Sequence, residues 1–135
     1  MSHQTIELNP THPFVIARGG YSHHRNVIVR LTDEEGYDGF GEAAPNRYYG
    51  ESVSTVISAL AQFKPILERA DAFSLESIES HLNRVLRGNA SAKGAISSAL
   101  HDLVGKRLGL PVHRLWGLDA STAPQSSFTI AIAEN

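Results

Sequence analysis

The sequence contains no cysteine, no long run of like charge and no apolar stretch long enough to span a bilayer. Without cysteine there is no disulfide framework, no thiolate nucleophile and no cysteine-ligated metal site. A formal net charge of −2 without a basic stripe argues against a nucleic-acid surface. The first residues lack the basic and then apolar pattern of a signal peptide. We therefore expect a cytoplasmic protein with no nucleic-acid or membrane partner.

The first third of the chain has the pattern of β-strands. The 135 residues, 41% of them hydrophobic and 19% charged, fit one globular domain. Strands are expected at 5–8, 14–17, 26–31 and 37–42, with a polar loop at 18–25 and a turn at 32–36. Val27, Val29 and Leu31 alternate with Ile28 and Arg30, which indicates one buried face. The pattern predicts an antiparallel meander of about three strands.

After Pro45 the apolar residues recur at helical spacing. Helices are expected at about 52–64, 75–87, 90–108 and 112–116. Pro65 has no amide proton, so the first helix should end or kink just before it. The third helix should be capped by Asn89 or Ser91, and its apolar stripe is rich in small residues that allow another backbone to approach closely. Strands followed by about three to four helices predict an α+β fold.

The patterns that usually mark catalytic or metal sites are absent or incomplete. The sequence has 7 histidines, but no Glu or His stands at helical spacing from the adjacent His23 and His24. His81, His101 and His113 are isolated on expected helices. There is no G-x-S-x-G motif, and GFGEAAP at 39–45 lacks the third glycine and the following helix of a dinucleotide motif.

Glu42, within GFGEAAP, is a single carboxylate after a strand. A general acid or base needs a second catalytic group within reach, and the chain offers no obvious paired carboxylate with a partner lysine. We interpret Glu42 as a residue that caps or hydrogen-bonds the neighbouring loop.

Two irregular segments carry side chains suited to ligand binding. Arginine matches carboxylates with two hydrogen bonds, and tyrosine supplies rigid amphipathic contact. Both segments should project from strand ends. The candidate binding residues of segments 18–25 and 45–51 are Arg18, Tyr21, His23, His24, Arg25, Arg47, Tyr48 and Tyr49.

Several phrases occur in an order that resembles a known family. They are IARGG at 16–20, NVIV at 26–29, GFGEAAP at 39–45, RYYGES at 47–52, SAKGAISSALHDLVGKRLGLPVHRLWGL at 91–118 and SSFTIAI at 126–132. Together they resemble the N-terminal capping domain of the enolase superfamily, in its mandelate racemase and muconate lactonizing branch. Within that branch the resemblance is to dipeptide epimerases acting on L-Ala-D/L-Glu.

The resemblance implies a division of labour between two domains. In that family a cap covers the mouth of a modified (β/α) barrel, and the barrel holds the Mg²⁺ ligands and the catalytic lysines. A proton next to a carboxylate is removed, and opposing lysines exchange it to invert the centre. Two loops of the cap close over the substrate, and they match segments 18–25 and 45–51 here. The resemblance thus implies that these segments bind substrate, with Arg18 contacting a substrate carboxylate.

The resemblance also implies how the chain is divided. Residues 1–118 correspond to the cap, 119–127 to a linker and 128–135 to the first barrel strand. We therefore expect no catalytic residue and no metal ligand in this chain, which alone should be inactive, and a barrel domain and a small dipeptide as its partners. An exposed apolar strand at 128–132 also favours homo-oligomers.

Two other readings stay open at this point. One is a different enzyme of the branch, such as a cycloisomerase or o-succinylbenzoate synthase. The other is a free-standing α+β binding module.

Overall fold

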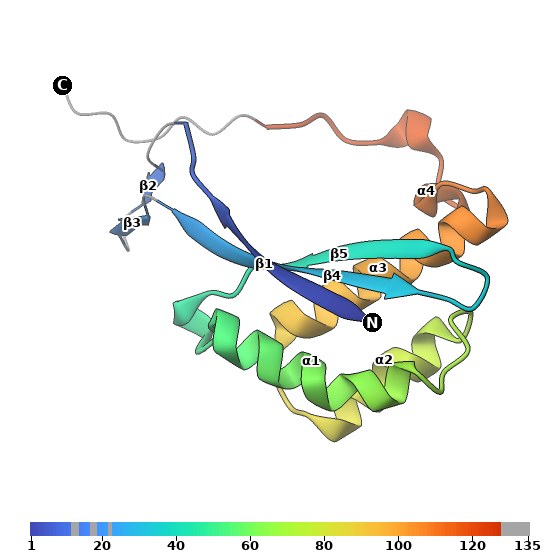
Figure 1. Ribbon diagram of the computed structural model, residues 1–135. Coiled ribbons are helices and arrows are strands. Elements are labelled where there is room, and N and C mark those ends of the chain that lie inside the picture. Colours follow the sequence, from blue (N-terminus) through green and yellow to red (C-terminus); the bar gives the residue numbers. More distant parts are fainter. Residues whose placement is uncertain (12–13, 17–18, 22, 128–135) are drawn as a thin grey trace.

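The computed structural model describes residues 1–11, 14–16, 19–21 and 23–127, and for residues 14–16 and 19–21 it describes the backbone only. The strands are β1 (Ser2–Leu8), β2 (Phe14–Ile16), β3 (Gly19–Tyr21), β4 (His24–Thr32) and β5 (Asp38–Ala43). They form a three-stranded antiparallel sheet in the order β1-β4-β5 and a separate two-stranded hairpin of β2 and β3 (Figure 1).

The segment expected to be a loop, 18–25, is only partly irregular. Residues 19–21 form β3, which pairs with β2, and β4 already begins at His24. The expectation was wrong there because glycine was taken as a sign of a loop. A short hairpin is held by backbone hydrogen bonds. Gly20 can therefore pair with Val15 although it has no side chain.

The three-stranded sheet has one face turned to the core, as its alternation predicts. Val27, Val29 and Leu31 of β4 are buried on that face. In the register, Val27 pairs with Thr5 of β1 and with Ala43 of β5. The α+β class, with strands first and helices after, is confirmed.

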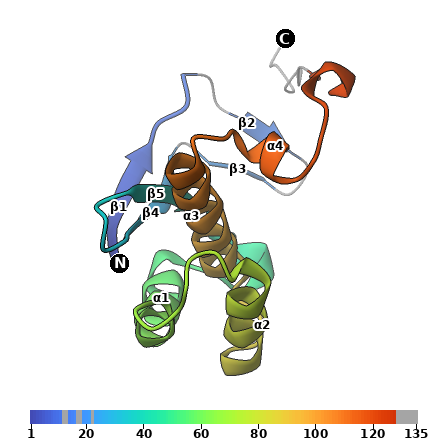
Figure 2. The ribbon, with the colours of Figure 1, turned by 90° about the vertical axis from the view of Figure 1, so that its right-hand side faces the viewer.

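The helices follow the strands and cover the core face of the sheet. They are α1 (Val53–Leu67), α2 (Leu75–Val85), α3 (Ala90–Leu108) and α4 (Val112–Leu115), with 3-10 turns η1 (Arg47–Tyr49) and η2 (Ala120–Thr122). Figures 1 and 2 show α1, α2 and α3 on the same side of the sheet, with α3 running along β5. Phe63, Leu60 and Leu82 are among the largest fully buried side chains.

Helix α1 continues past Pro65, which was expected to end or kink it. It runs two residues beyond Pro65, to Leu67. Proline in the last turn costs one backbone hydrogen bond. Ile66 and Leu67 pack against the core, and this burial compensates for the missing bond.

Strand β5 lies directly on the backbone of α3, and its two glycines make this contact possible. A Cβ atom at Gly41 would stand 1.9 Å from the carbonyl oxygen of Ala95, and one at Gly39 would stand 1.9 Å from that of Ala99. Alanines on the helix and glycines on the strand therefore let two backbones meet. The prediction that α3 is central because of its small residues is confirmed by its buried stripe.

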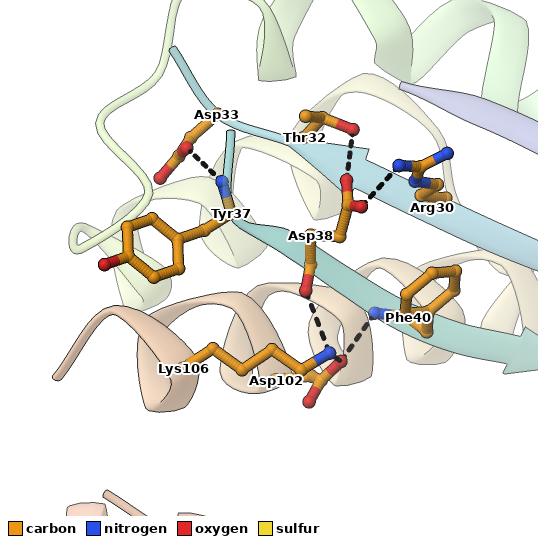
Figure 3. Close-up of polar contacts among 8 residues, drawn as sticks. All are labelled: Arg30, Thr32, Asp33, Tyr37, Asp38, Phe40, Asp102 and Lys106. Atoms are coloured by element: carbon orange, nitrogen blue, oxygen red, sulfur yellow. Dashed lines mark hydrogen bonds and ion pairs between the residues drawn. The ribbon is translucent and has the colours of Figure 1, made fainter. Parts of the chain in front are cut away.

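The outer edge of β5 is covered by side chains from α3 (Figure 3). The amide of Phe40 donates to Asp102 at 2.9 Å, and Lys106 donates to the carbonyl oxygen of Asp38 at 2.9 Å. Lys106 also pairs with Asp102 at 2.6 Å and lies 5.1 Å from the Phe40 ring centroid. These contacts occupy backbone groups that would otherwise be open to another strand.

On the outer face of the sheet, Asp38 is held as a carboxylate by two donors. Arg30 donates to it and Thr32 donates at 2.6 Å. These bonds keep the pKa of Asp38 below its ordinary value, the bond from Arg30 contributing most. The same pair raises the pKa of Arg30.

Candidate substrate-facing turn

The turn between β5 and α1 is built around Asn46. Its side-chain oxygen accepts from the amide of Tyr48 at 2.9 Å. Its carbonyl oxygen accepts from the amides of Tyr49 at 3.0 Å and Glu51 at 3.2 Å. Gly50 takes the left-handed conformation, with φ of 73°, that a residue with a side chain rarely adopts. The backbone of the turn is thus fixed by its own polar groups.

This turn displays the three predicted binding residues of segment 45–51. Arg47 is exposed, as are Tyr48 and Tyr49, whose exposed fractions are 65% and 75%. The two tyrosine rings meet edge to face, with centroids 5.0 Å apart. Large aromatic side chains held outside the core on an ordered backbone are typical of binding surfaces.

The predicted residues of the other segment begin at the same end of the sheet. His23, His24 and Arg25 are exposed at the start of β4. Since Val27 pairs with Ala43, the start of β4 lies beside the end of β5, from which the 45–51 segment departs. Arg18 lies outside the described residues, and for Tyr21 only the backbone in β3 is described.

Glu42 lies at the same end of the sheet, near the end of β5, and it has a structural partner. The side-chain amide of Asn26 donates to Glu42 at 2.6 Å. Asn26 is itself buried on β4. The bond joins the start of β4 to the end of β5, which supports the interpretation of Glu42 as a residue that hydrogen-bonds at the base of the loop.

A second carboxylate, Glu51, was not recognised from the sequence as an anchor. Its exposed fraction is 8%, and it accepts hydrogen bonds from the amide of Ser91, at 3.2 Å, and from the Ser91 hydroxyl. No local sequence pattern could indicate this contact, because 40 residues separate Glu51 from Ser91. Of the two caps expected for α3, Asn89 does occupy the N-cap position, but not with the expected side-chain bond. Asn89 makes no side-chain cap bond, and Ser91 lies inside the helix.

A cavity of about 480 Å³ lies at the opposite end of the sheet. It is lined by the β4–β5 turn, the α1–α2 connection and α3, and none of the described candidate binding residues lines it. Arg107 on its wall pairs with Asp33 at 3.3 Å and with Glu35. These ion pairs tie the hairpin turn to α3, so Arg107, Asp33 and Glu35 have structural roles in the cavity wall.

The described residues contain neither a cluster of metal ligands nor a membrane-spanning helix. No group of three or more His, Asp or Glu side chains there is placed to hold a metal ion. The described residues therefore offer no Mg²⁺ site. None of the helices in the same part of the chain combines the length and apolar character needed to cross a membrane.

The geometry defines a class of domain before any comparison. A sheet covered on one face by helices carries, at one end, an ordered turn with exposed arginine and tyrosine side chains. The chain belongs to the mandelate racemase / muconate lactonizing enzyme family, whose N-terminal domain matches residues 2–117.

Individual relatives agree with this assignment. The chain is 37% identical over 126 residues to the L-Ala-D/L-Glu epimerase of Bacteroides thetaiotaomicron, covering 93% of this chain and 32% of that protein. It is 34% identical over 114 residues to the N-succinyl-L-Arg/Lys racemase of Bacillus cereus, covering 83% and 31%. The chain thus spans about a third of the length of the curated relatives it matches.

A solved structure shows the same fold over nearly the whole chain. It is a dipeptide epimerase from Cytophaga hutchinsonii, complexed with Mg and the dipeptide D-Ala-L-Val. The TM-score is 0.90 and the sequence identity 28%, over 98% of this chain and 36% of that one.

Proposed function

We propose that this chain is the N-terminal cap of a dipeptide epimerase acting on L-Ala-D/L-Glu, and that its 18–25 and 45–51 segments contact the substrate. The proposal is carried by the likeness to one relative named L-Ala-D/L-Glu epimerase and to a solved dipeptide epimerase with a bound dipeptide. The ordered turn that exposes Arg47, Tyr48 and Tyr49 supports it. In this proposal residues 1–118 form the cap, 119–127 the linker and 128–135, which lie outside the described residues, the first barrel strand.

The described side chains suit a small peptide with a free carboxylate. The guanidinium of Arg47 can give two parallel hydrogen bonds to a carboxylate. The Tyr48 and Tyr49 rings can cover apolar parts of the substrate and exclude water from it. Arg18 remains the residue predicted to contact a substrate carboxylate.

The chemical step belongs, in this proposal, to a barrel domain outside this chain. There the C–H bond next to the carboxylate breaks, and a proton returns to the opposite face of the same carbon. Mg²⁺ bound by that domain would stabilise the negative charge that develops. The cap contributes binding and orientation, so the chain by itself turns over no substrate.

The test is an exchange experiment on the complete gene product. With Mg²⁺ and L-Ala-L-Glu in D₂O, the α-hydrogen of the Glu residue should be replaced by deuterium as L-Ala-D-Glu forms. The 135-residue chain alone should give no exchange. Exchange on N-succinyl-L-Arg with none on dipeptides would overturn the dipeptide assignment and favour the activity for which the racemase relative is named.

A further inference from the structure

Glu51 is a buried carboxylate that pairs with no cation among the described residues. Charged residues are seldom buried unless they are paired, and no ion pair is found for Glu51 within the described part of the chain. Its compensation comes from the start of α3, where it accepts from the amide and hydroxyl of Ser91. The first amides of a helix have no partner inside the helix and favour negative charge.

Ser91 in turn contacts both ends of the segment that carries the turn. Its hydroxyl oxygen lies 3.2 Å from the carbonyl oxygen of Ala44 and closer to Glu51. A hydroxyl has one proton, so it donates chiefly to the nearer carboxylate. Residues 44 and 51 are thus both brought to the first turn of α3.

Fixing Glu51 also fixes the backbone of the turn. The Glu51 amide donates to the carbonyl oxygen of Asn46, which also accepts from Tyr49. On the other side, Ser52 begins α1 with a reciprocal pair of bonds to Thr55. The position of Glu51 therefore determines where the exposed tyrosines stand relative to α3.

We propose that Glu51 and Ser91 act as a pair of positioning residues that hold the Arg47–Tyr49 turn in a preformed arrangement for substrate. The inference rests on the proposed function for its link to substrate, but not for the ordering of the turn. A turn held in place before binding loses less freedom when the substrate arrives, which lowers KM. Neither residue needs to touch the substrate.

The first arm of the test uses the 135-residue chain and no substrate. Amide hydrogen exchange of Tyr49, Gly50 and Glu51 should become about tenfold faster in Ser91→Ala. Ser91→Thr keeps the hydroxyl and should restore slow exchange. Ser98→Ala, at an exposed site on the same helix, is the matched control and should change nothing.

A double variant asks whether the two residues act as one unit. In Glu51→Ala/Ser91→Ala the turn amides should exchange no faster than in the faster single variant. The amides of Leu100 and Leu103 in the middle of α3 should keep their protection. Additive acceleration, unchanged turn amides, or loss of protection throughout α3 would each overturn the positioning pair.

The second arm uses the complete gene product and its kinetics. Ser91→Ala should raise KM for L-Ala-L-Glu about tenfold while kcat stays within about threefold, because a substrate-binding turn contributes to both ground and transition states. Ser91→Thr should return KM to the wild-type value. A fall in kcat at unchanged KM would overturn the role toward substrate. A gene product inactive on dipeptides, with the exchange results intact, would overturn the proposed function and leave the ordering of the turn standing.

Discussion

Two consecutive segments of this chain differ in the size and placement of their side chains. In β5, Gly39 and Gly41 have no side chains, so the strand can pack directly against the backbone of α3. In the turn that follows, Tyr48 and Tyr49 keep large side chains away from the core, and polar bonds hold the backbone. The comparison teaches that the residues that stabilise the fold and those proposed to bind substrate are separated within about a dozen residues, so we expect that each set can be changed without the other.

The largest effect is expected where β5 meets α3. Gly41→Ala places a Cβ against the carbonyl oxygen of Ala95, and neither backbone can yield without disturbing the sheet. We expect a loss of about 3 kcal/mol or more in the free energy of unfolding, measured by urea denaturation.

The matched control is a glycine on α3, the helix that β5 contacts. Gly94 lies on α3 with no atom near its added Cβ, so Gly94→Ala should stabilise the chain by about 0.5–1 kcal/mol. If both variants had equal stability, the backbone contact would not be what makes β5 require glycine.

A smaller effect is expected at the edge of β5. Asp102→Ala removes the acceptor of the Phe40 amide and the partner of Lys106. The free energy of unfolding should fall by about 1–2 kcal/mol, and the open edge should increase self-association measured by ultracentrifugation. Asp102→Asn keeps an oxygen acceptor and should lose less. Equal loss in the two variants would contradict a role for the backbone bond.

The smallest effect on stability is expected on the outer face of the sheet, and it depends on pH. The pKa of Asp38 is lowered on folding, so its contribution is present above the unfolded pKa of about 3.9 and is lost as the pH falls through the folded value. Wild type should melt slightly above Asp38→Asn near neutral pH, and the gap should close on acidification. A gap that widens in acid has the wrong sign for this account.

The sequence predicted most of the fold because the relevant signals are local. Alternation identified the core face of β4, and the stripe of small residues identified α3 as central. Two of the predictions were wrong, each for a different physical reason. Pro65 was overruled by tertiary burial of the residues after it, and the hairpin strand at 19–21 was hidden by its glycines.

The candidate site was only partly predictable. The exposed arginine and tyrosine residues of the turn could be selected by type, because their side chains suit binding. Glu51 could not be recognised as an anchor, because its partner Ser91 comes from a helix 40 residues away. For the same reason Asn89 could be predicted as the N-cap of α3, whereas the carboxylate that accepts from the first turn of the helix is distant in sequence.

The most direct measurement of the separation between stability and recognition is made on one variant, Tyr48→Ala/Tyr49→Ala. In the 135-residue chain its free energy of unfolding should stay within about 0.5 kcal/mol of wild type, since both side chains are exposed. In the complete gene product kcat/KM for L-Ala-L-Glu should fall at least about tenfold. Unchanged kcat/KM, or a large loss of stability, would contradict the account.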